Sequence, residues 1–257
     1  MVYWEVVRRM VYEADVVMEI ADARFPEKSR NRELEEIVRR ARKKLVIVLN
    51  KSDLISKRGA ERAKEGIEER CVFVSAKKRS GAGMLRAEIE GLAQGGEAKV
   101  AIVGYPNTGK SSIINMLKGR KAARTSSTAG FTKGKQYVRI SSRVLLIDTP
   151  GVIPPRENDE TLMALTGMKS SHQLKDLEGT GMDVAEYLFR TMGEELKGFY
   201  GVEAKDGEEF LEKLAMKRKK LVSGGRPDTN AAARILIDDF QKGAIGKKAQ
   251  KHAISGN

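Results

Sequence analysis

The stretch KVAIVGYPNTGKSSIINMLK, residues 99–118, joins an apolar β-branched run, a short loop and a helical segment. Its loop places Gly104, Gly109, Lys110 and Ser111 in the pattern G-x4-G-K-S. Glycines let backbone N–H groups surround phosphates, the lysine neutralises the β- and γ-phosphates, and the hydroxyl coordinates Mg²⁺. A glycine-rich turn with a solvated lysine is the simpler alternative, but it does not require the complete motif in this context. We therefore expect nucleotide contacts from the following residues: Tyr105, Pro106, Asn107, Thr108, Gly109, Lys110, Ser111 and Ser112.

A second motif, LLIDTPG at residues 145–151, ends another apolar run. An aspartate at the carboxyl end of a strand, here Asp148, can hold Mg²⁺ through water, and the Gly151 N–H can sense the γ-phosphate. A D-x-x-G tetrapeptide is common in turns. It becomes informative because it lies downstream of a phosphate loop and at the end of a buried strand.

The polar segment TSSTAGFTKGK, residues 125–135, lies between these motifs. We expect Thr132 to supply a second hydroxyl ligand to Mg²⁺, with Thr128 as the alternative. An ordinary flexible loop with surface threonines is the competing interpretation. Lys110, Thr132 and Gly151 are the residues that we expect to act in catalysis.

A base-binding motif appears much earlier, in LVIVLNKSDL at residues 45–54. The Asp53 carboxylate can accept hydrogen bonds from the ring N–H and exocyclic amine of guanine, which adenine does not offer. Asn50 would tie the loop to its surroundings, and the Lys51 stem would lie against the base. The SAK sequence at the end of the next strand (Ser75, Ala76 and Lys77) would present a backbone N–H to the guanine carbonyl. A helix cap after a strand is the alternative for Asn50 and Asp53.

Apolar runs of strand length alternate with helical patterns in the first part of the chain, which predicts a doubly wound α/β domain. The expected strands span residues 15–22, 44–50, 71–75, 99–104 and 143–148, and a hairpin joins 135–140 to the last of them. The base-binding loops precede the phosphate loop, which is a circular permutation of the usual order. Binding depends on where strand ends lie in space, so a permuted chain can form the same site.

After about residue 155 the strand patterns stop and helical patterns follow. The expected helices span Asp159–Met168, Gly181–Leu196, Asp206–Lys220 and Thr229–Lys242, with Thr180 and Asp228 or Thr229 as caps. We therefore expect two domains, residues 1–157 with the nucleotide motifs and residues 158–257 as a small all-α domain. The helix spacing gives little support to a helix-turn-helix DNA-binding module.

The net charge is +13, with 48 Lys and Arg against 35 Asp and Glu, which favours a polyanionic partner such as RNA. The run Lys217, Arg218, Lys219 and Lys220 is the strongest candidate for RNA contact, although such clusters are often solvated helix faces. The single Cys71 excludes an internal disulfide and fits a reducing cytosol. No apolar run approaches the about 20 residues of a membrane-spanning helix. We expect a cytoplasmic monomer that does not bind membranes.

With this motif order the chain resembles the circularly permuted GTPases of the YlqF/RbgA type, a ribosome-assembly family. The similar segments are DARFPEKSRN (22–31), NKSDL, SAK, GYPNTGKSSIIN, AGFTKGKQ and IDTPGV, and a looser match covers LAMKRKKLVSGGRPDTNAAARILIDDFQKGAIG. The resemblance implies a P-loop GTPase domain, GTP hydrolysis and maturation of the large ribosomal subunit through ribosomal RNA. A GTP-dependent switch whose helical domain binds an unrelated protein effector is the alternative.

Two departures from known GTPases bear on hydrolysis. Bacterial members of the family begin with a Trp-Phe-Pro-Gly-His element, whereas the first histidine here is His172. Val152 follows the D-x-x-G motif, where many GTPases have a water-orienting glutamine, so we expect slow intrinsic hydrolysis. The resemblance implies that Asn107 coordinates K⁺, and a turn-forming asparagine is the alternative.

Overall fold

A computed structural model describes residues 2–93, 96–122, 136–148 and 159–245 of the chain. The backbone contacts divide the chain into two compact units, Met1–Glu157 and Asn158–Asn257. Within the described ranges, no helix combines the length and the apolar character that a membrane span requires.

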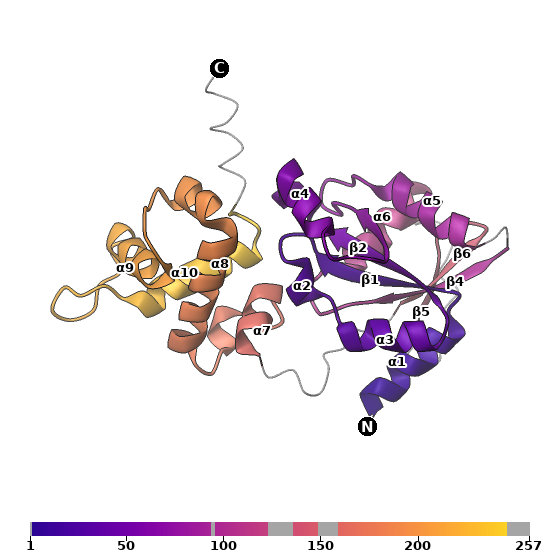
Figure 1. Cartoon of the computed structure of the whole chain (residues 1–257), viewed down its shortest axis with the longest axis horizontal. Coiled ribbons are helices and arrows are strands. Elements are labelled where there is room, and N and C mark those ends of the chain that lie inside the picture. The colour runs from indigo at the N-terminus through magenta and orange to yellow at the C-terminus, as the bar shows by residue number, and fades with distance from the viewer. Residues whose placement is uncertain (1, 94–95, 123–135, 149–158, 246–257) are drawn as a thin grey trace, which may run out of the picture. The chain divides into compact units, whose positions relative to one another are not determined.

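The first unit (Figure 1) is built on a six-stranded sheet, and its strand order is β3-β2-β1-β4-β6-β5. Neighbouring strands are parallel, except for β5 and β6, which form an antiparallel hairpin at one edge. The strands are β1 (Val16–Asp22), β2 (Lys44–Asn50), β3 (Arg70–Phe73), β4 (Ala98–Val103), β5 (Gln136–Arg139) and β6 (Val144–Asp148). The predicted mostly parallel sheet with an edge hairpin is confirmed.

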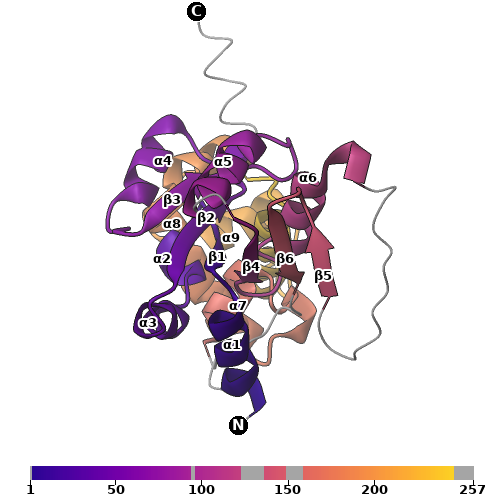
Figure 2. The same cartoon turned by 90° about the vertical axis from the view of Figure 1, so that its right-hand side faces the viewer.

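Helices cover both faces of this sheet (Figure 2). On β1, Val16, Met18 and Ile20 belong to one apolar core with residues of α5 and α6. Val17 belongs to another core, with residues of α1 and α3. Because both faces are covered, the strands are nearly continuous apolar runs, as their sequences indicated. The helices of this unit are α1 (Val2–Glu13), α2 (Pro26–Ser29), α3 (Arg32–Arg40), the 3-10 turn η1 (Ser52–Leu54), α4 (Lys57–Lys64), α5 (Ala82–Leu92) and α6 (Lys110–Ala122).

Strand β1 lies between β2 and β4, and the chain winds away from it in both directions. The carboxyl ends of parallel strands meet at one edge of a sheet, where ligands bind at such a switch point. The loop after β2, the loop after β3 and the loop after β4 therefore gather at this edge. The motifs predicted for nucleotide binding follow these three strands, although they are far apart in the sequence.

The second unit is helical, as predicted, and contains α7 (Glu160–Thr166), η2 (Ser171–Gln173), α8 (Leu177–Tyr200), α9 (Gly207–Lys217) and α10 (Thr229–Gln241). Asp228 caps α10 by accepting a 2.8 Å hydrogen bond from the Ala231 N–H. The prediction that Thr180 caps α8 is wrong. Asp176 is the cap, because its carboxylate accepts from the Gly179 N–H at 2.9 Å and the helix therefore begins a turn earlier.

Two other local predictions differ from the structure. Helix α4 ends at Lys64, and Gly66 then turns the chain with a φ of 74°. Strand β3 accordingly begins one residue early, at Arg70. The run at residues 217–220 was expected on a helix, but α9 ends at Lys217 and the rest lies in the following loop.

Candidate functional site

The phosphate loop requires glycine at two positions where it closely approaches strands β1 and β2. Gly104 has a φ of +138°, and a Cβ there would lie 2.4 Å from the Ile20 carbonyl oxygen of β1. Gly109 has a φ of +100°, and its Cβ would lie 2.2 Å from Nδ2 of Asn50. Both distances are too short for any side chain, so the loop is shaped by its neighbours as well as by its own sequence.

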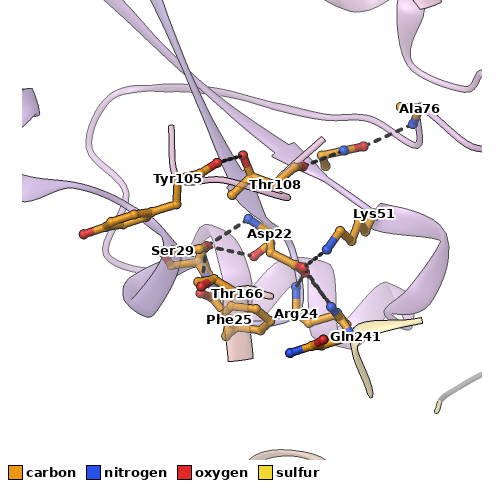
Figure 3. Close-up of polar contacts among 12 residues, drawn as sticks. Asp22, Arg24, Phe25, Ser29, Lys51, Ala76, Tyr105, Thr108, Thr166 and Gln241 are labelled. Carbon is orange, nitrogen blue, oxygen red and sulfur yellow. Dashed lines mark hydrogen bonds and ion pairs between the residues drawn. The ribbon is translucent and has the colours of Figure 1, made fainter. Parts of the chain in front are cut away.

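Lys110 begins α6 and is largely buried. Its Nζ donates to the carbonyl oxygens of Gly104 at 2.8 Å and Tyr105 at 2.6 Å. The Thr108 hydroxyl donates to the same Tyr105 carbonyl at 2.8 Å (Figure 3). The ammonium group is therefore fixed against the loop that would surround the phosphates. Ser111 and Ser112 follow it, exposed in the first turn of α6, where the helix end favours anions.

Asn50, the last residue of β2, connects its own loop with the phosphate loop and with the loop after β3. Its Nδ2 donates to the Thr108 carbonyl of the phosphate loop at 2.8 Å. Its Oδ1 accepts from the Ala76 N–H of the loop after β3 at 3.1 Å. The Asn50 side chain is buried, so these hydrogen bonds hold the base-binding and phosphate-binding segments at a fixed separation.

The base-binding loop presents Asp53 on η1 with one carboxylate oxygen already held. The Ser75 hydroxyl donates to Oδ1 of Asp53 at 2.6 Å and accepts from the Lys78 N–H at 3.1 Å. Within the described part of the chain, Oδ2 of Asp53 has no hydrogen-bond donor. Ser75 is fully buried, so it orients Asp53 and does not itself face a ligand. Lys77 is exposed in the next turn.

The base-binding loop is also held by Asp22, a residue to which the sequence analysis assigned no role. Asp22, at the end of β1, forms ion pairs with Arg24 at 2.9 Å and with Nζ of Lys51 at 2.7 Å (Figure 3). Burial raises the pKa of Asp22, but the two cations outweigh it and lower this pKa to about 2. The pairing of β1 and β2 places Asp22 opposite Asn50. The D-A-R sequence was the available signal, and only the fold shows its contact with Lys51.

The structure brings most of the predicted nucleotide-binding residues to one edge of the sheet: Asn50, Lys51, Asp53, Ser75, Ala76, Tyr105, Thr108, Gly109 and Lys110. Pro106 is half-buried, and Asn107 is exposed with a φ of 60°. Asp148 is the last residue of β6. Thr128, Thr132, Gly151 and Val152 lie outside the described residues, so their predicted roles stay predictions.

The candidate RNA-contact residues divide into two kinds. Lys217 donates from Nζ to the Gly201 carbonyl at 2.7 Å, and the Arg218 guanidinium lies 5.7 Å from the centre of the Tyr200 ring. Lys219 and Lys220 are exposed, and their side chains have no ion-pair or hydrogen-bond partner among the residues that the structure describes. All four are exposed, but the first pair also contacts other residues of the second unit, whereas the second pair has no such contact among the described residues.

Lys219 and Lys220 belong to an ordered loop between α9 and α10, residues 218–228, which we call the basic loop. Its ends are joined by a bridge between Leu221 and Pro227. The Val222 N–H donates to the Arg226 carbonyl at 2.9 Å, and the Asp228 N–H donates to the Lys220 carbonyl at 2.9 Å. The loop is thus a preformed, exposed and positively charged projection.

The chain is similar to known GTP-binding proteins. The family model described as 50S ribosome-binding GTPase matches residues 99–205. An uncharacterised GTP-binding protein of Methanocaldococcus jannaschii is 40% identical over 94% of this chain and 65% of its own length. Nucleolar GTP-binding protein 2 of Neurospora crassa is 32% identical over 94% of this chain and 40% of its own length. The chain therefore spans between 40% and 65% of these two relatives.

Two solved structures have the same fold over almost the whole chain. The GNP-bound YlqF from T. maritima is 26% identical, with a TM-score of 0.64 over 95% of this chain and 94% of that chain. The GDP-bound form is 24% identical, with a TM-score of 0.65 over 93% of this chain and 94% of that chain. The similarity includes the helical unit as well as the sheet.

Proposed function

We propose that this chain, which resembles the YlqF type of circularly permuted GTPase in its fold and in the order of its motifs, binds GTP and hydrolyses it to GDP and phosphate. The observation that carries the proposal is the pair of hydrogen bonds from Asn50 to Thr108 and from Ala76 to Asn50. They join a guanine-reading loop to a phosphate-binding loop although the two are far apart in the sequence. The nucleotide-bound forms of YlqF support the same assignment.

In this proposal each loop has a separate task. Asp53 accepts hydrogen bonds from the guanine ring, and Ala76 donates its N–H to the guanine carbonyl. The backbone N–H groups of residues 105–110 surround the phosphates, and Lys110 neutralises their charge. Gly151 senses the γ-phosphate.

The residues fit a magnesium ion of the kind that such enzymes use. Ser111 offers an exposed hydroxyl oxygen at the start of α6. Asp148 is the last residue of β6, the strand that pairs with β4. Mg²⁺ prefers oxygen ligands and takes the remainder from phosphates and water. We propose Ser111, Asp148 and Thr132 as its protein ligands. When bound, the ion neutralises charge that develops between the β- and γ-phosphates.

Phosphate release from GTP tests the proposed activity. Val152 cannot orient water, so we expect intrinsic turnover on the order of 10⁻³ s⁻¹ or below, the range of unassisted GTPases. Asn107 as a K⁺ ligand predicts faster release in KCl than in NaCl at equal ionic strength. Asn107→Ala should remove that difference while leaving the slower rate in NaCl. Equal rates of the unsubstituted chain in the two salts would contradict the potassium role, and no Mg²⁺-dependent release would contradict the activity.

We further propose that the chain acts in assembly of the large ribosomal subunit and that residues 158–257 form its RNA-binding domain. The family description, the names of the nucleolar relatives and the net charge of +13 support this assignment. The alternative is a switch whose helical unit binds an unrelated protein effector. The exposed apolar side chains of Met216, Leu221 and Val222, in and beside the basic loop, are the observation that favours it.

Substitution of the basic loop separates these possibilities. Lys219→Ala with Lys220→Ala removes two unpaired cations, so binding to large-subunit RNA should weaken. The slope of log affinity against log salt should fall in magnitude by about 1.5, because each lost phosphate contact contributes about 0.7 to 0.9. Lys175→Ala with Lys205→Ala is the matched control, because these lysines are exposed in the same unit outside the basic loop. An equal effect of both pairs, or no effect of the first, would contradict the assignment.

A further inference from the structure

Asp22 occupies a position between the two halves of the candidate site. Strand β1 pairs with β2 on one side and with β4 on the other. The Ile20 carbonyl lies against Gly104 of the phosphate loop, and Asp22, two residues later, contacts Lys51 of the base-binding loop. The end of β1 therefore supports both loops, although none of its residues belongs to a nucleotide-binding motif.

The Asp22 carboxylate is shared between two cations, and both of its oxygens are used. Oδ1 accepts from the backbone N–H and from Nε of Arg24, each at 3.0 Å. Oδ2 accepts from a terminal nitrogen of Arg24 at 2.9 Å and pairs with Nζ of Lys51 at 2.7 Å. The Asp22 side chain is 2% exposed and the Lys51 side chain 23% exposed, so water screens this contact poorly. Arg24 fixes the carboxylate, and the carboxylate fixes the lysine.

Lys51 needs such an anchor. Its backbone is left-handed, with a φ of 63° and a ψ of 27°, so its side chain leaves the loop in a direction that few residues adopt. A free lysine side chain has about 2 kcal/mol of rotamer entropy to lose when it is held against a ligand. The ion pair to Asp22 removes that freedom before the ligand arrives.

We propose that Asp22 is a positioning residue for guanine-nucleotide binding, because it holds the Lys51 side chain in place as a support for the base. The inference rests on the proposed function. In this proposal Asp22 acts through Lys51 and does not itself contact the nucleotide. Substitution of Asp22 should therefore lower the affinity for a ligand that contains guanine, but not the affinity for a ligand that consists of phosphate groups alone.

The test compares GDP with inorganic tripolyphosphate, each measured by competition against a fluorescent guanine nucleotide. Asp22→Asn combined with Arg24→Met removes both charges of the buried pair, which avoids leaving an unpaired buried cation. We expect GDP affinity to fall about tenfold, the equivalent of one charge-assisted hydrogen bond, and tripolyphosphate affinity to change by less than about twofold. Asp22→Glu keeps the charge but displaces it by one methylene, and it should also lower the affinity for GDP.

Arg30→Met with Glu35→Gln is the matched control. These side chains form another buried ion pair in the same unit, 1% and 2% exposed with a 2.8 Å contact, and they make no contact with Lys51 in the described structure. This variant should lower the melting temperature without changing GDP affinity. If this control and the Asp22→Asn, Arg24→Met variant lost the same affinity for GDP, Asp22 would have a role in stability only, and the proposal would be overturned.

Lys51→Met completes the experiment. If Asp22 acts through Lys51, this substitution should lower the affinity for GDP about tenfold in the otherwise unsubstituted chain. In the Asp22→Asn, Arg24→Met background it should lower that affinity by less than about twofold. The proposal would be overturned if Lys51→Met lowered the affinity for GDP equally in both backgrounds. It would also be overturned if the Asp22→Asn, Arg24→Met variant bound GDP as tightly as the unsubstituted chain. Failure of the unsubstituted chain to bind GDP would instead overturn the proposed function, and this inference with it.

Discussion

Asp53→Asn is expected to lower the affinity for GDP about 100-fold and to raise the affinity for xanthosine diphosphate, so that the preference between the two is reversed. The Asp53 carboxylate would accept from both the ring N–H and the exocyclic amine of guanine. An asparagine directs an amide donor at one of these positions, where guanine also donates. Xanthine has a carbonyl oxygen in place of the amine and so accepts from that amide.

The local structure makes this substitution well suited to a test. Ser75 holds Oδ1 of Asp53 at 2.6 Å, and an asparagine oxygen can accept the same hydrogen bond, so the loop should keep its shape. Competition titrations with GDP and xanthosine diphosphate measure the change. Asp15→Asn is the control, since Asp15 precedes β1 at the opposite edge of the sheet, where its carboxylate accepts from the Lys99 N–H. Unchanged GDP affinity of Asp53→Asn would show that Asp53 does not bind the base.

Gly109→Ala is expected to lower nucleotide affinity more than about 100-fold, because it disturbs both halves of the site at once. The added Cβ would lie 2.2 Å from Nδ2 of Asn50, which must then move. Asn50 holds Thr108 on one side and Ala76 on the other, so its displacement releases the phosphate loop and the guanine carbonyl donor together. The φ of +100° adds backbone strain for any residue with a Cβ.

Gly83→Ala is the matched control for this prediction. Gly83 lies inside helix α5, and a Cβ there would have no heavy atom within 4 Å. Alanine should stabilise that helix by about 0.5–1 kcal/mol without affecting nucleotide binding. Isothermal titration with GDP and a thermal melt separate the two effects. A Gly109→Ala chain that binds GDP as well as Gly83→Ala would contradict the close packing of the phosphate loop on Asn50.

The sequence was most informative where function depends on short motifs at strand ends. The spacing of Gly104, Gly109 and Lys110 predicted the phosphate loop because the flanking strand and helix are coded in adjacent residues. The base-binding loop was predicted in the same way from Asn50 and Asp53. Their proximity followed from a general property of parallel sheets, so the permuted order could be recognised without coordinates.

Individual side-chain contacts between distant residues were not predictable. The role of Asp22 depends on strand pairing that brings it opposite Asn50, and no local pattern specifies that pairing. The lysine and arginine run at residues 217–220 appeared uniform, yet Arg218 lies over the Tyr200 ring, whereas the side chains of Lys219 and Lys220 have no partner among the residues that the structure describes. Thr180 was the predicted cap of α8, but the structure has Asp176 in that role, one turn earlier.

The central claim is that loops from three separate parts of the chain bind one guanine nucleotide, and competition between nucleotides tests it most directly. A chain saturated with fluorescent GDP is titrated with GTP and, separately, with ATP in the presence of Mg²⁺. We expect one bound nucleotide per chain, full displacement by GTP and no displacement by ATP at about thousandfold excess, since adenine offers Asp53 no matching donors. Displacement by ATP at the same concentrations as GTP would contradict it.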